Sequence, residues 1–328
     1  MRAQAIALLW AAAAVATTAA AMATTAAAQS YPAKPIRLIV GSAPGGPIDF
    51  AARLAAQKLT EALGQSVVVD NRTGAGGTIG TDYVAKSTPD GYTLLMASAA
   101  TLCITPALYP KIPYNTLKDF APVSTVAAVS YVVVVPASLP VKSLQEFIAL
   151  AKSRAGQLRY GSAGSGSVTH LAVELFRSMA GIEVAHIPYK GAGPAMIDLL
   201  GGQLDFMFDS VLTSTPLIKA GRLRALGQTA GRRSPVLADV PSIGEAALPG
   251  YDVSTWFGLV APANTPREII AKLNAAMVKS LAASETRERL LAQGIEPLGG
   301  TPAAFAQLLR DELPKWAQVV KVSGARIE

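Results

Sequence analysis

Cysteine and histidine are the residue types that this sequence has least of. Its 328 residues include one cysteine, Cys103, and two histidines, His170 and His186. A single cysteine cannot form an internal disulfide, and it cannot supply a cysteine-based zinc or iron–sulfur site. Two histidines leave little for a histidine-rich metal site. We therefore expect no disulfide framework, no bound metal and no cofactor.

Charge is also sparse, because only 16% of the residues are charged while 51% are hydrophobic. The apolar fraction excludes a disordered or fibrous protein, and no fixed repeat indicates a solenoid. The formal net charge is +7, but the basic residues are scattered, with one tight pair at residues 232–233. A stripe of basic residues with interleaved aromatics is missing, so we expect no nucleic-acid partner.

The first 28 residues are typical of a secretory signal. Arg2 gives a basic start, residues 5–15 are wholly apolar, and small residues end in an alanine triplet at residues 26–28. The apolar run is shorter than the roughly 20 residues of a membrane-spanning helix. We predict a signal peptide at residues 1–28, cleaved after Ala28, and export to the periplasm.

The remaining chain alternates short apolar strands, glycine-rich loops and amphipathic helices. This alternation indicates α/β layers with parallel strands. The length and the number of strands exceed one core and one sheet, so we predict two α/β lobes with a binding site between them. Strands are expected near residues 36–40, 67–69, 92–96, 131–135, 158–160, 184–187, 204–208, 223–226 and 256–260.

Two loops have the same glycine-rich construction. The first loop, residues 41–47, and the second loop, residues 161–167, each join an expected strand to an expected helix. Glycines let backbone N–H groups face a ligand, and a helix start adds unpaired donors and partial positive charge. Each loop alone could be a tight turn, but the pair favours two cradles that hold one small oxyanion.

Most sequence motifs that are typical of enzymes are absent. A P-loop and a zinc-protease motif are absent, and alanines at 43 and 163 occupy the serine place of the G-x-S-x-G pattern. Residues 74–80 resemble a dinucleotide-binding loop, but the third glycine falls one place late. One catalytic alternative stays open, in which Ser162 or Ser165 is a nucleophile paired with His170.

Several polar residues have a structural interpretation beside the functional one. His186 lies inside an apolar strand and is expected to be a structural histidine with a hydrogen-bond partner. Asp49 stands in the first turn of a helix, where acidic residues commonly cap. Asp209, at the carboxyl end of a strand, could face the ligand site. Trp256 is expected in the core.

A series of short motifs runs along nearly the whole chain after residue 28. They are YP (31–32), KPIR (34–37), PGG (44–46) with Asp49 and AR (52–53), NR (71–72), GAGG (74–77), PDGYTLL (89–95), DFAPV (119–123), PYKG (188–191), DLLGGQ (198–203), AGRLR (220–224), VPS (240–242), PGY (249–251), WFG (256–258), AP (261–262) and TP (265–266). In this order they resemble the Bug-type solute receptors, the extracytoplasmic binding components of tripartite tricarboxylate transporters.

The resemblance implies the two-lobed α/β fold of a periplasmic binding protein of type II-like architecture. Each lobe would be a mixed sheet flanked by helices, with the ligand cleft between the lobes. The implied boundaries are residues 29–128 together with 252–328 for lobe 1, and residues 129–251 for lobe 2.

The resemblance also implies a ligand carboxylate held mainly by backbone N–H groups and ordered waters. Pro47, which lacks an N–H, could reshape the first cradle, although proline is ordinary at a first helical position. Residues 97–103 are expected to set the ligand's shape. The expected ligand-binding residues are Ser42, Pro44, Gly45, Gly46, Asp49, Ser98, Thr101, Ser162, Gly164, Ser165, Gly166, Ser167, Thr169, His170, Tyr189 and Asp209.

The resulting hypothesis is a periplasmic receptor that closes on a small carboxylate, which could be a dicarboxylate, a tricarboxylate, an amino acid or an aromatic acid. Its partners would be membrane transport subunits, and it would act as a monomer without catalysis. Two alternatives stay open: an exported serine–histidine hydrolase, and a ligand sensor for a membrane signalling protein.

Overall fold

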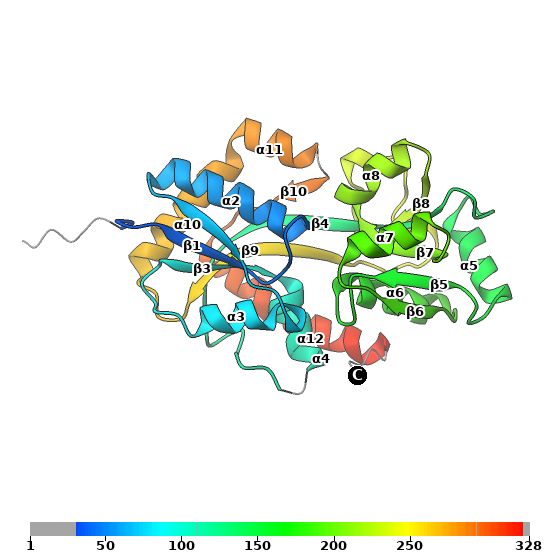
Figure 1. Ribbon diagram of the computed structural model, residues 1–328, viewed down its shortest axis with the longest axis horizontal. Helices are drawn as coiled ribbons and strands as arrows, with labels where there is room; N and C mark the ends of the chain where they lie inside the picture. Colours follow the sequence, from blue (N-terminus) through cyan, green and yellow to red (C-terminus); the bar gives the residue numbers. More distant parts are fainter. Residues whose placement is uncertain (1–30, 110, 293, 324–328) are drawn as a thin grey trace, which may run out of the picture. The chain divides into compact units, whose positions relative to one another are not determined.

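The computed structural model describes residues 31–109, 111–292 and 294–323. The chain divides into two compact units, Met1–Lys34 and Pro35–Glu328. The predicted signal peptide, residues 1–28, lies outside the described residues. The second unit holds all the helices and strands named below (Figure 1).

Strands and helices alternate through this unit much as the sequence indicates. The strands are β1 (Ile36–Val40), β2 (Val67–Asn71), β3 (Thr93–Ser98), β4 (Phe120–Pro136), β5 (Arg159–Ser162), β6 (Ala185–Pro188), β7 (Phe206–Ser210), β8 (Leu223–Gln228), β9 (Ser254–Pro262) and β10 (Ile295–Pro297). The helices are α2 (Pro47–Leu63), α3 (Thr78–Ala85), α4 (Thr105–Leu108), α5 (Leu144–Ser153), α6 (Val168–Ala180), α7 (Ala192–Leu200), α8 (Val211–Lys219), α9 (Ile243–Ala246), α10 (Arg267–Ala282), α11 (Ser284–Leu291) and α12 (Pro302–Ser323). Three short helical segments are η1 (Ala75–Gly77), η2 (Ala100–Ile104) and η3 (Pro235–Leu237).

The strands pair in the order β2-β1-β3-β9-β4-β7-β5-β6, with β8 and β10 also on β4. Pairing is parallel among β1, β2 and β3, and again among β5, β6 and β7. The expectation of parallel strands is therefore confirmed at both ends of the sheet order. It is wrong at the centre, where β4 and β9 are antiparallel to their neighbours because the chain crosses there between the two sets.

The long strand β4 carries the backbone from one set of strands to the other. Its residues 120–130 pair with β9, while Tyr131 and the residues after it pair with β7 and β8 (Figure 1). Only the apolar second half was expected as a strand. The first half is harder to recognise because it contains Pro122 and the buried polar residues Ser124 and Thr125.

The strand register brings two sets of carboxyl ends toward one stretch of β4. Ser98, the last residue of β3, pairs with Phe257, which in turn pairs with Ala127. Ser210, the last residue of β7, pairs with Tyr131. Because β3 runs in the same direction as β4 and β7 runs against it, both strands end facing this short stretch.

Helices cover both faces of the sheet (Figure 1). Helix α2 packs against α10, whereas α12 packs against β4, η2 and α6. The core includes the fully buried aromatic side chains of Phe147, Phe206 and Trp316. Trp256 is 5% exposed, which confirms its expected place in the core.

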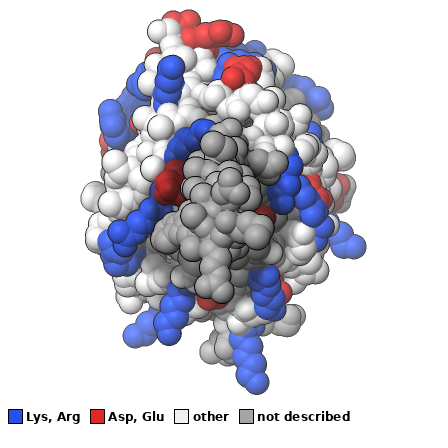
Figure 2. Space-filling view, turned by 90° about the vertical axis from the view of Figure 1, so that its left-hand side faces the viewer, with Lys and Arg blue, Asp and Glu red and all other residues white. Residues whose placement is uncertain are grey.

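The surface and the helix lengths add two observations. Figure 2 shows Lys and Arg side chains spread over one face of the molecule, with Asp and Glu side chains among them. Among the described residues, every helix is either too short or too polar to span a bilayer.

Candidate functional site

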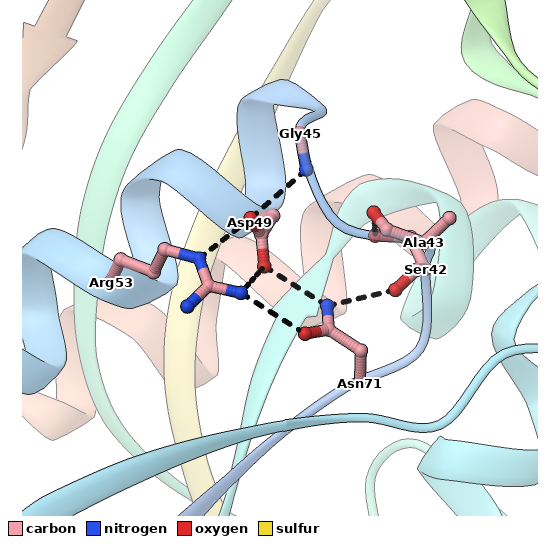
Figure 3. Close-up of polar contacts among 6 residues, drawn as sticks. All are labelled: Ser42, Ala43, Gly45, Asp49, Arg53 and Asn71. Carbon is pink, nitrogen blue, oxygen red and sulfur yellow. Dashed lines mark hydrogen bonds and ion pairs between the residues drawn. The ribbon is translucent and has the colours of Figure 1, made fainter.

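The first loop is tied down by the side chain of Asp49, in the first turn of α2 (Figure 3). The carboxylate accepts hydrogen bonds from the Gly45 N–H (3.0 Å), from Arg53 Nε (2.9 Å) and from Asn71 Nδ2 (3.0 Å). Asn71, at the end of β2, also donates to the Ser42 carbonyl oxygen (3.0 Å). The network therefore joins the end of β2, the loop and the start of α2.

Asp49 is only 3% exposed. Burial acts to raise the pKa of its carboxyl, but the hydrogen bonds from Arg53, Gly45 and Asn71 outweigh burial and leave the pKa below its ordinary value. The side chain is therefore a paired carboxylate at neutral pH. Arg53 engages both of its oxygens, the geometry in which guanidinium–carboxylate pairs are strongest.

A third glycine loop, residues 74–77, backs the first loop. A methyl group on Gly41 would lie 2.9 Å from both the Cα atom and the carbonyl oxygen of Gly77. Gly77 itself has φ +90°, and a methyl group there would lie 2.8 Å from Thr101 Cγ2. The Gly41 and Gly77 backbones and the Thr101 side chain thus leave no room for a methyl group at either glycine, which explains these glycines without a dinucleotide.

Ser98 and Thr101 lie where β3 ends and η2 begins, and both are buried. The Ser98 N–H donates to Thr101 Oγ1 (3.2 Å), and the Thr101 N–H donates to Ser98 Oγ (3.3 Å). Each hydroxyl therefore caps the other residue's backbone. This reciprocal pair fixes the turn that follows β3.

The second loop follows β5 and is braced by its own hydroxyl groups. The Gly164 N–H donates to Ser162 Oγ (3.1 Å), and the Ala163 N–H donates to Thr169 Oγ1 (3.1 Å). Ser167 caps α6, because its hydroxyl accepts from the His170 N–H (3.2 Å). These contacts hold the turn in place through side chains of the loop and of the first turn of α6.

Two stacked histidines lie beneath the second loop. His186 stacks on His170 with ring centroids 4.2 Å apart, and on its other face it stacks on Tyr160 at 4.7 Å. Ser162 Oγ lies 2.7 Å from His186 Nε2, and the Gly166 N–H donates to His170 Nδ1 (3.1 Å). An accepting Nδ1 requires that neutral His170 carries its proton on Nε2.

Burial lowers the pKa of both histidines. For His186 the pKa falls to about 4, first through burial and then through the neighbouring His170. For His170 burial lowers the pKa, with Glu174 acting in the opposite direction. Both lowered pKa values favour neutral rings at pH 7, and for His170 the accepting Nδ1 requires a neutral ring as well.

Tyr189 supports the second loop from behind. Its N–H donates to the Ser162 carbonyl oxygen (3.2 Å), and its hydroxyl donates to Asp198 Oδ2 (2.6 Å). That hydrogen bond is the first cause that raises the pKa of Tyr189 to about 12. The Tyr189 carbonyl oxygen would lie 3.1 Å from a methyl group on Gly164, so the two backbones are in close contact.

Asp209, near the end of β7, is 1% exposed. Its Oδ2 accepts from Thr213 Oγ1 (2.6 Å) and Ser214 Oγ (2.7 Å), both in the first turns of α8. Burial raises the pKa of Asp209 despite these bonds. The carboxyl group therefore fastens α8 to β7.

Some backbone N–H groups of the two loops have no acceptor among the described residues. They stand at the starts of α2 and α6, where helix geometry leaves N–H groups unpaired. Such groups can hold an anion. They include the N–H groups of Gly46, Ile48 and Asp49 in and after the first loop, and those of Ser165, Val168 and Thr169 in and after the second.

The structure tests some of the expected roles of the site residues and leaves others untested. The structure does not bring together the expected nucleophile pair of Ser162 or Ser165 with His170: among the described residues, His170 Nδ1 accepts from Gly166, and the Ser162 hydroxyl pairs with His186 instead. His186 has the partner that its structural interpretation requires. Direct ligand contact by the sixteen expected residues stays a prediction.

Sequence reasoning missed several residues that build the site. Arg53 and Asn71 hold Asp49, while Gly41 and Gly77 let two loops meet. The four-residue spacing of Asp49 and Arg53 on one helix was a usable signal for their ion pair. The contact between Gly41 and Gly77 had no signal, because it depends on how β1, β2 and β3 pair.

Comparison with known proteins places this geometry in a family. Residues 51–325 match the sequence profile described as tripartite tricarboxylate transporter family receptor. Protein BugT of Bordetella pertussis is 41% identical over 300 residues, covering 91% of this chain and 92% of BugT.

Solved structures agree with the sequence match. R. palustris Rpa4515 with adipate has a TM-score of 0.86 at 37% identity, covering 90% of this chain and 100% of that one. MatC (Rpa3494) from Rhodopseudomonas palustris with bound malate has a TM-score of 0.81 at 36% identity, covering 88% of this chain and 100% of that one. The fold is thus the two-lobed α/β fold of periplasmic binding proteins. The chain belongs to the tripartite tricarboxylate transporter receptor family, whose members are solute-binding receptors and not enzymes.

Proposed function

We propose that this protein captures a small carboxylate, with a dicarboxylate as the favoured class, for a tripartite uptake system. The observation that carries the proposal is the pair of loops with unpaired N–H groups, which follow strands whose carboxyl ends face one stretch of β4. A ligand with an anionic group at each end could engage both loops at once. Malate and adipate, which two similar structures contain, are acids of this kind.

The proposal includes closure of the lobes around the ligand. Lobe 1 would comprise residues 29–128 and 252–328, and lobe 2 residues 129–251. The change of strand partner at Tyr131 in β4 supports a boundary near this point. A ligand that contacts both loops favours the closed form by its differential affinity for that form.

Location and partners follow from the same proposal. Residues 1–28 would direct export to the periplasm and be removed. The closed receptor, acting as a monomer, would then dock on membrane transport subunits. A role as ligand sensor shares the same binding chemistry, and a pull-down with transporter and sensor subunits separates the two.

Ligand capture predicts thermal stabilisation by acids of this class. We expect malate or adipate, at ten times its Kd, to raise the free energy of unfolding by about 1.4 kcal/mol. Differential scanning calorimetry with malate, adipate, citrate, aspartate and benzoate measures this, with 1,6-hexanediol as the uncharged control. A protein that none of these acids stabilises would contradict the proposal.

Two helix-capping serines form a matched pair for testing the second loop. Ser167 caps α6 beside the proposed ligand site, whereas Ser143 caps α5, accepting from the Glu146 N–H. Ser167→Ala and Ser143→Ala should each lower the free energy of unfolding by about 1 kcal/mol. Only Ser167→Ala should weaken binding of the stabilising acid in titration calorimetry. Equal ligand affinities in the two variants would show that the second loop is not part of the ligand site.

A further inference from the structure

The Asp49 carboxylate, in the first turn of α2, accepts hydrogen bonds from the first loop, from α2 and from the end of β2. We propose that the side chain of Asp49, together with those of Arg53 and Asn71, has a positioning role: it shapes the first loop for its ligand without touching the ligand. This inference rests on the proposed carboxylate-binding function. It reassigns Asp49 from the direct contact that the sequence resemblance implied.

Both oxygens of Asp49 are occupied. Oδ2 accepts from the Gly45 N–H (3.0 Å) and Arg53 Nε (2.9 Å), and Oδ1 accepts from Arg53 Nη2 (3.1 Å) and Asn71 Nδ2 (3.0 Å). The residue is 3% exposed, so solvent scarcely reaches it. A carboxylate that accepts four hydrogen bonds in this setting has no capacity left for a ligand, and its charge would repel an acid.

The contacts decide which N–H groups of the loop stay available. Gly45 adopts φ +92°, and its N–H turns back to Asp49. Pro47 begins α2 and has no N–H. The unpaired N–H groups of Gly46, Ile48 and Asp49 are therefore the ones that this turn leaves for an anion. Asn71 fixes the same turn from the other side, through the Ser42 carbonyl oxygen.

Arg53 has a second effect, on charge. An unpaired carboxylate in the first turn of α2, beside the binding loop, would disfavour an anionic ligand by Coulomb repulsion, more strongly for a dianion than for a monoanion. The guanidinium cancels that field. Its side chain is 56% exposed, so Arg53 can be replaced without opening the core.

The test compares variants along this network by titration calorimetry. The probe is malate or adipate, whichever the wild-type protein binds more tightly, with the monoamide of the same acid as the monoanion. Arg53→Gln should weaken dianion binding about tenfold, since it removes a charged hydrogen-bonding partner, and weaken the monoamide less. Asp49→Asn/Arg53→Gln should recover part of the dianion loss, because the unpaired charge is gone.

Lys58 provides the matched control. It lies on the same helix and pairs with Glu61 (2.9 Å) away from the loop. Lys58→Gln should leave the Kd of the dianion within about twofold, a change well under 1 kcal/mol. Thermal unfolding of each variant reports separately on stability, and a purely structural role of Arg53 would weaken the dianion and the monoamide equally.

Each outcome decides the question. If the wild-type protein binds none of these acids, the proposed function fails, and the inference fails with it. If the wild type binds but Arg53→Gln matches Lys58→Gln, or the dianion and monoamide weaken equally, only the positioning role is overturned. Selective loss of the dianion with partial recovery in the double variant supports the inference.

Discussion

Replacing Gly41 with alanine is expected to destabilise the protein by about 3 kcal/mol, the upper part of the range for overpacking a well-packed site. The new methyl group would lie 2.9 Å from the Gly77 Cα atom and carbonyl oxygen. These are backbone atoms, so relief requires that one of the two loops moves. Urea unfolding measures the stability loss, and calorimetry with the stabilising acid should show weaker binding than in Arg53→Gln.

Gly46 offers a control within the same loop. It has φ −85°, and a methyl group there meets no atom within 4 Å. Gly46→Ala should therefore keep wild-type stability, even where it hinders a ligand at the neighbouring N–H group. If Gly41→Ala were as stable as Gly46→Ala, the claim that the Gly77 backbone leaves no room for a side chain at Gly41 would be wrong.

Acid is expected to weaken the fold through the stacked histidines. The folded-state pKa of His186 is lowered from 6.5 to about 4, so the unfolded chain binds its proton first as the pH falls. The stabilisation of the folded state by neutral His186 is complete above pH 6.5 and is lost as the pH falls toward 4. Allowing for partial exposure of the ring, the loss is about 2 kcal/mol. Unfolding free energies measured from pH 7.5 to pH 4 test this.

His186→Gln is the comparison for the acid experiment, because glutamine can keep a hydrogen bond to Ser162 but does not titrate. The variant should show a shallower fall in stability over the same range. The other groups facing the stack are His170, whose pKa is also lowered, and Glu174, which accepts from the Tyr160 hydroxyl (2.7 Å). A pH dependence identical in variant and wild type would contradict the assignment to His186.

Asp209 contributes with the opposite sign. Burial raises its pKa in the folded state, so the folded protein takes up that proton more readily than the unfolded chain. Its contribution to stability is present below the ordinary pKa of 3.8 and is lost as the pH rises through the folded value. The difference between wild type and His186→Gln cancels this effect, because Asp209 is present in both proteins.

Local sequence signals account for several element ends. Serine is a preferred residue just before a helix, and α5 runs from Leu144 to Ser153 with the Ser143 hydroxyl accepting from the Glu146 N–H. Glycine commonly follows the last turn of a helix, and Gly64 stands in the left-handed conformation after α2. Such features succeed because the residues that cause them are close in sequence.

The site was predictable in kind but not in detail. The glycine and serine content of the two loops indicated available N–H groups. The partner of the Ser162 hydroxyl lies far along the chain, because it is His186, 24 residues away. That contact exists because β5 and β6 pair with Tyr160 opposite His186. Composition and spacing do not encode such a register, whereas the Gly164 and Gly166 N–H groups are occupied by nearby partners, Ser162 Oγ and His170 Nδ1.

The unbroken run of β4 has a mechanical consequence. Strand β4 changes its pairing partner at Tyr131 but continues as one strand. Any motion of its two halves relative to each other would therefore have to bend or twist a backbone that is hydrogen-bonded on both sides of Tyr131. The register irregularities beside Ser124 and Ala127 interrupt the regular hydrogen bonding, so the strand is expected to bend most easily there. Substitutions at these positions would change the free energy needed to bend β4. They would thereby change ligand affinity although they contact neither the ligand nor the first or second loop.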